Sequence, residues 1–92
     1  MIGQKVIVRT YSAGVHFGTL AARDGKEVSL TGAKRIWRWY GANTLNEIAL
    51  RGVLPTSKIS DPVPSILLTE AIEVIPVTDN AAANLESAKW AK

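Results

Sequence analysis

The pair Asp24 and Gly25 constrains the fold most, because it lies between two segments of strand-like composition, 15–22 and 26–30. Asp-Gly flanked by such segments is a strong local signal for a β-hairpin with a tight turn. We therefore predict that the two segments pair as antiparallel strands. A second hairpin is expected upstream, where residues 5–10 precede a turn-forming stretch.

Residues 33–40 alternate as a further strand, after a break that we place at Thr31 and Gly32. Side chains alternate between the two faces of a sheet along each strand. The expected faces are Arg35, Trp37 and Trp39 on one side and Ile36, Arg38 and Tyr40 on the other. This gives four strands before the first helix.

A short helix is expected to begin at Thr44, because Thr44 and Glu47 have the spacing of a capping box. It should end at Arg51, where Gly52 is suited to close it with a positive φ. This helix is the first element that interrupts the run of strands.

The rest of the chain predicts a loop, an apolar segment and a final helix. Residues 54–64 carry three prolines and should form the loop, which an edge strand can contact, whereas 65–75 fits a strand or a bent pair of strands. A helix is the alternative for 65–75. The alanine-rich residues 80–90 predict a terminal helix, anchored by Leu85 and Trp90.

These elements predict one α+β domain over residues 1–92. Its expected form is a small curled antiparallel sheet or partly open barrel, with one short helix after the fourth strand and a C-terminal helix. The hydrophobic share of 47% and the charged share of 21% are those of a globular protein. A chain of 92 residues buries only a modest core, so we expect a homo-oligomer.

Composition also bounds the function. The net charge of +3 and the pI of about 9.5 suit an anionic partner. No apolar run approaches a membrane span and no secretion signal is evident, so we expect no membrane association and a cytoplasmic location. With no cysteine and one histidine we expect no metal and no cofactor. Common catalytic motifs are missing, and we expect a non-enzymatic protein.

Residues 35–40 hold two of the three tryptophans, one of the two tyrosines and two arginines. Flat rings and guanidinium groups bind planar, phosphorylated ligands, and the expected helix start adds main-chain amides. The predicted ligand-binding residues here are Arg35, Trp37, Arg38, Trp39, Tyr40, Asn43 and Thr44. The alternative is that the tryptophans fill the core, the arginines lie at its rim and Thr44 only caps the helix.

A second candidate group, Tyr11 and His16, lies in and just after the turn of the upstream hairpin. His16 can donate to a phosphate, and Tyr11 can close over a ring. The alternative is that the turn needs its glycines for geometry alone and that His16 is an ordinary satisfied polar residue. The two groups form one site only if the fold brings this turn to the strand 33–40.

The chain resembles a family of short proteins encoded by tailed bacteriophages and prophages, known only as a domain of unknown function. The resemblance rests on residues 8–18 (VRTYSAGVHFG), 35–45 (RIWRWYGANTL), 47–52 and 68–76, and covers most of the chain. It implies a viral protein that acts in the cytoplasm of a bacterial host. It also implies a protein that binds, blocks or scaffolds rather than catalyses.

Our leading hypothesis is a non-enzymatic phage accessory protein that binds a nucleotide-like anion. In its sharpest form the ligand is a nucleotide-derived signal of host immunity that the phage sequesters, a step taken by analogy. One alternative is a module that binds nucleic acid or a host protein through the same aromatic and arginine side chains. The other is a structural or assembly component of the virion.

Overall fold

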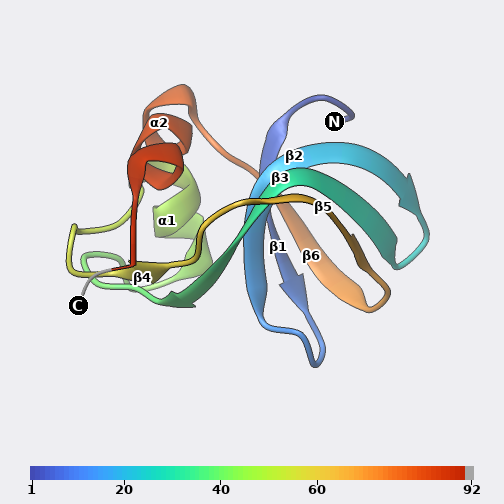
Figure 1. Ribbon diagram of the computed structural model, residues 1–92, viewed down its shortest axis with the longest axis horizontal. Coiled ribbons are helices and arrows are strands. Elements are labelled where there is room, and N and C mark those ends of the chain that lie inside the picture. Colours follow the sequence, from blue (N-terminus) through green and yellow to red (C-terminus); the bar gives the residue numbers. More distant parts are fainter. Residues whose placement is uncertain (91–92) are drawn as a thin grey trace.

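The computed structural model describes residues 1–90 and shows a strongly curled antiparallel sheet with two helices packed at one end (Figure 1). The strands are β1 Lys5–Thr10, β2 Val15–Asp24, β3 Glu27–Arg38, β4 Lys58–Ile59, β5 Val63–Leu68 and β6 Ala71–Pro76. The helices are α1 Leu45–Arg51 and α2 Asp79–Ser87. The predicted α+β class is confirmed.

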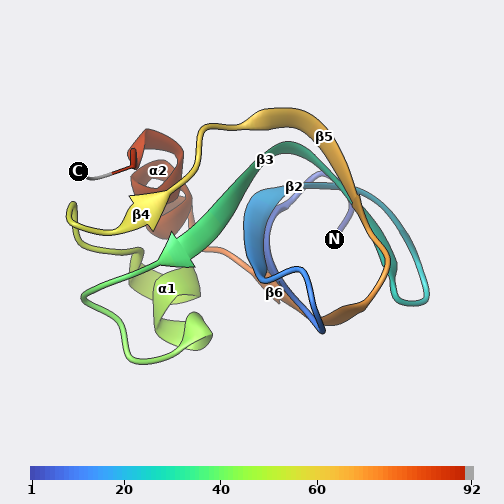
Figure 2. The ribbon, with the colours of Figure 1, turned by 60° about the horizontal axis from the view of Figure 1, so that its bottom comes forward.

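The six strands form one sheet in the order β4-β3-β2-β1-β6, with β5 paired to the other end of β3. Figure 2 shows this sheet wrapped around its own interior, with both helices outside the curl. Within the described residues β5 and β6 do not pair with each other, so the sheet stays open and does not close into a barrel.

Both predicted hairpins are confirmed. β1 pairs with β2, and β2 pairs with β3 up to the partners Asp24 and Glu27. Gly25 has φ +59° at the first central position of this turn, which is where a type II′ hairpin turn places glycine.

The predicted strand break at Thr31 and Gly32 is wrong, because β3 runs without interruption for 12 residues. Gly32 has φ +56°, and the register places Gly32 and Ala33 opposite the single residue Gly18 of β2. This is a β-bulge, which bends a strand without ending it. Helix α1 therefore follows the third strand of the chain, not the fourth.

The later elements differ from their predictions mainly at the boundaries. The expected loop 54–64 contains β4, which pairs with β3, and the first residues of β5. The segment 65–75 is confirmed as a bent pair of strands. Helix α2 ends at Ser87, three residues before the predicted end, and Gly52 closes α1 with φ +81° as predicted.

Two apolar clusters hold the layers together. The cluster inside the curl consists of Val6, Val8, Leu20, Val28, Leu30, Ala33, Leu68 and Ala71. The cluster between the outer face and the helices consists of Ile7, Phe17, Ile36, Ile48, Ala49, Val53, Ile59, Ala82 and Leu85. Full burial of one large aliphatic or aromatic side chain contributes about 1.5–3 kcal/mol, so both faces of the sheet stabilise the fold.

Candidate functional site

The turn between β1 and β2 is fixed by its own side chains and by the turn between β5 and β6. Thr10 Oγ1 donates to the Gly14 carbonyl at 2.8 Å and accepts from the Ala13 N–H at 2.8 Å. Ser12 Oγ donates to the Glu70 carboxylate at 3.0 Å. The turn therefore presents a fixed wall to whatever lies beside it.

His16 lies beneath this turn and is only 1% exposed. Its Nε2 is 2.9 Å from the Ala13 carbonyl, and because a carbonyl only accepts, Nε2 carries the proton. Burial lowers the pKa of His16, the hydrogen bond to Ala13 opposes this, and the charge of Arg35 lowers it further. His16 thus supports the turn through its bond to Ala13, and it also lines a hollow of about 260 Å³ together with Arg35. Contact between His16 and a ligand stays a prediction.

The exposed end of β3 faces the same turn across a hollow of about 330 Å³. The walls of this hollow are Ser12, Ala13, Gly14, Val15, Arg35, Ile36, Trp37 and Trp39. The fold therefore brings Arg35, Trp37 and Trp39 to the turn that precedes His16. Trp39 also packs against the helix-side core, whereas Trp37 is 55% exposed.

Arg35 lies where this hollow meets two smaller ones of about 260 and 150 Å³. Its main-chain N–H donates to Ser60 Oγ at 2.8 Å, which fixes the backbone of β3 at this point. Its guanidinium makes no hydrogen bond or ion pair with any other residue of the described chain, 1–90. Five donors of fixed charge are therefore available to an anion.

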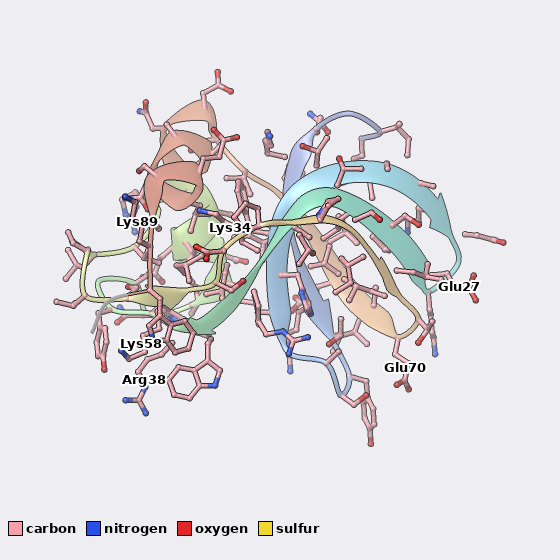
Figure 3. The ribbon with its side chains drawn as sticks, in the orientation of Figure 1. Glu27, Lys34, Arg38, Lys58, Glu70 and Lys89 are labelled. Atoms are coloured by element: carbon pink, nitrogen blue, oxygen red, sulfur yellow. The ribbon has the colours of Figure 1, made fainter. Side chains whose placement is uncertain are left out.

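Trp37 also stacks on Trp90, with ring centroids 5.2 Å apart and an angle of 27° between the planes. The guanidinium carbon of Arg38 lies 5.3 Å from the Trp37 centroid, and Lys58 Nζ lies 5.3 Å from the Trp90 centroid. Figure 3 shows Arg38 and Lys58 at the same corner of the molecule. The prediction that Trp90 anchors the terminal helix is wrong, because it lies beyond α2 and packs on β3 instead.

Lys34 holds the chain after α2 in place, and no sequence feature pointed to this role. It is 7% exposed, and its Nζ donates to the carbonyls of Leu85, Glu86 and Ala88 at 3.0, 2.8 and 2.9 Å. Burial lowers the pKa of Lys34, and the negative charges of Asp61 and Glu86 oppose that shift. A lysine at a helix C-terminus satisfies orphan carbonyls and complements the helix dipole.

The start of α1 is not the open anion site that the sequence predicted. The Asn43 N–H donates to one Glu47 carboxylate oxygen at 2.9 Å, and Thr44 Oγ1 donates to the other at 3.1 Å. The hydrogen bond from Asn43 lowers the pKa of the exposed Glu47 carboxyl, with smaller contributions from Thr44 and Arg51. The protein's own carboxylate therefore occupies the position that a phosphate would take.

The two predicted tyrosines lie apart from the hollow. Tyr11 is 77% exposed at the tip of the β1–β2 turn, and Tyr40 is 44% exposed just after β3. The Tyr40 main-chain N–H donates to Ser57 Oγ at 2.9 Å. Neither ring lines the hollow shared by Arg35, Trp37 and Trp39.

Comparison with known protein families gives a match over most of the chain. The family model of a domain of unknown function, DUF6948, matches residues 3–85. The chain belongs to the DUF6948 family. Comparisons of this DUF6948 member with curated proteins and with solved structures found no match.

The hollow beside the β1–β2 turn combines exposed aromatic rings, a fixed wall and one guanidinium without a hydrogen-bond or ion-pair partner in the described chain. Among residues 1–90, no three histidine, aspartate or glutamate side chains gather as a metal site requires. No helix in that range has the length and apolar character needed to cross a membrane.

Proposed function

We propose that the protein is a non-enzymatic binding protein for a nucleotide-like anion, which it holds in the hollow between the β1–β2 turn and β3. The observation that carries this proposal is the Arg35 guanidinium, which has no partner among residues 1–90 and lies beside Trp37 and Trp39. A cation next to exposed aromatic rings offers the two contacts that a base and its phosphate need.

In this site Trp37 or Trp39 stacks on the planar ring, and the Arg35 guanidinium donates a charge-assisted hydrogen bond to the phosphate. Stacking contributes about 1–3 kcal/mol and a hydrogen bond to a charged group about 1.5–3 kcal/mol. The sum, about 2.5–6 kcal/mol, corresponds to a Kd no tighter than about tens of micromolar. The Asn43 amide and the Thr44 hydroxyl are not part of the proposed site, because Glu47 engages them.

We further propose that the protein acts in a phage-infected bacterium and sequesters a nucleotide-derived signal of host defence. The support is the resemblance of residues 8–18 and 35–45 to short phage proteins, together with the Arg35 guanidinium and the tryptophan rings beside it. A homo-oligomer stays a prediction. Protein expressed with candidate signal-producing enzymes, then heated, should release the bound molecule for mass spectrometry.

The direct test of binding is calorimetric titration with AMP, GMP, ADP and ADP-ribose. At least one should bind, and Arg35→Ala should weaken its affinity by about 10- to 150-fold, as expected for a lost bond to a charged group. The matched control is Arg23→Ala, which removes the same charge from the β2–β3 hairpin, where Arg23 Nε donates to the Gly25 carbonyl. The proposal is wrong if no nucleotide gives heat, or if both variants lose affinity equally.

A further inference from the structure

Trp90 lines a second hollow, of about 380 Å³, between the loop that follows α1 and the chain that follows α2. Its walls include Leu54, Pro55, Lys89 and Trp90. Trp37 lines the first hollow and Trp90 the second, and the two rings stack on each other at 5.2 Å. The stacked pair therefore connects the two hollows.

Each hollow combines a tryptophan with a cation. Arg35 lines the first hollow and Lys89 lines the second. Neither side chain forms an ion pair with another residue in the range 1–90. Arg38 and Lys58 lie against the two rings between them. In Figure 3 the labelled cations lie at the helix end of the molecule, whereas the labelled carboxylates, Glu27 and Glu70, lie at the opposite end.

The segment that carries Trp90 is tied to the fold. Lys34 bonds the carbonyls of Leu85, Glu86 and Ala88, so the chain is fixed two residues before Trp90. Trp90 nevertheless remains 48% exposed, as Trp37 remains 55% exposed. Exposed aromatic rings flanked by cations are the platforms on which proteins stack the bases of single strands.

We propose that the two hollows and the Trp37–Trp90 pair form one bipartite site for a short single-stranded oligonucleotide, with one base in each hollow and phosphates along Arg35 and Arg38. This rests on the proposed function, in which a single nucleotide fills only the Arg35 hollow. The two tryptophan centroids are 5.2 Å apart, and a base stacked on the outer face of each ring lies about 4.5 Å farther out. The two bases therefore lie about 14 Å apart. A stacked strand rises about 3.4 Å per nucleotide, so two bases about 14 Å apart are separated by about four steps and the ligand needs about five nucleotides.

The test is a length series, in which binding of AMP and of oligoadenylates of two to six nucleotides is measured by calorimetry. Affinity should rise by about 5- to 150-fold once the second base reaches its hollow, the range expected for one additional stacked base. Trp90→Ala should remove this gain and leave the AMP affinity unchanged, whereas Trp90→Phe should retain most of it. The matched control is Tyr40→Ala, which removes an exposed ring that lines neither hollow.

The outcomes separate this inference from the function on which it rests. If AMP binds and oligoadenylates bind no more tightly, the bipartite site is wrong and the proposed function stands. If the gain with length survives in Trp90→Ala, the bipartite site is also wrong. If neither AMP nor any oligoadenylate binds, the bipartite site is overturned, and the proposed function falls with it once GMP, ADP and ADP-ribose also give no heat. Circular dichroism of each variant verifies that the fold is retained.

Discussion

Lys34 and Arg35 are neighbours on β3 and carry the same charge, yet they face opposite sides and have opposite surroundings. Lys34 faces the helices, is 7% exposed, and donates to three carbonyls at the end of α2. Arg35 faces the hollow, is exposed, and its guanidinium has no hydrogen-bond or ion-pair partner among residues 1–90. Their surroundings differ because one side of β3 packs against the helices and the other side faces the hollow.

The same division holds for the next two residues of β3. Ile36 is buried in the helix-side core, and Trp37 is half-exposed beside the hollow. The helix-facing side thus uses its side chains to stabilise the fold, whereas the hollow-facing side leaves rings and charge accessible. Substitutions on the first side should act on stability, and those on the second on binding.

The largest expected effect on stability comes from Lys34→Met, which keeps the apolar stem but removes the ammonium. We expect the free energy of unfolding to fall by about 2–4 kcal/mol, less than three charged hydrogen bonds would sum to, because burying the ammonium itself costs energy. Urea unfolding measures this as a lower midpoint at an unchanged slope. Lys89→Met, at an exposed lysine, is the control, and equal stability of the two variants would contradict the role of Lys34.

The sequence predicts much of this fold because most turns depend on the residue types within the turn itself. Asp24 and Gly25 place the hairpin, and Gly52 places the end of α1, through the backbone conformations that those residue types favour. Gly32 is ambiguous in the sequence for a physical reason: a glycine with positive φ can end a strand or form a bulge within it. The pairing partner decides between the two, and here that partner, Gly18, lies on another strand.

The site was only partly predictable for a similar reason. The rings and arginines of β3 stand out by composition, and the register that pairs His16 with Arg35 brings them to the β1–β2 turn. Lys34 and Trp90 act through the docking of α2, and Lys34 bonds a carbonyl 51 residues away. No local pattern encodes such a contact, so neither the anchoring of the chain at the end of α2 by Lys34 nor the Trp37–Trp90 pair follows from the sequence.

A smaller effect on stability is expected from pH, through His16 on the interior side of the turn. Burial lowers its pKa in the fold, so below the ordinary value of 6.5 the unfolded chain binds more protons than the folded one. Stability should therefore fall as the pH is lowered from about 7 to about 5, by at most about 1.4 kcal/mol per pH unit for one group. The pKa of Glu47 is also lowered, but this changes the stability only below the ordinary pKa of 4.5, which is a more acidic range than that of His16.

The control for this pH dependence is His16→Gln, whose amide can still donate to the Ala13 carbonyl but does not titrate. Thermal melts of both proteins across that pH range should show a shallower dependence for the variant. Equal slopes would mean that His16 does not stay neutral in the fold, and that other groups cause the acid sensitivity.

The smallest expected effect on stability is that of Arg35→Ala, and it tests the comparison most directly. Because the guanidinium has no partner among residues 1–90, its removal breaks no hydrogen bond or ion pair within that range, and the free energy of unfolding should change by no more than about 0.5 kcal/mol. Removing positive charge near His16 should also raise the pKa of His16 slightly, which NMR titration of the ring can follow. A loss of stability as large as that of Lys34→Met would show that Arg35, too, belongs to the fold rather than to a ligand.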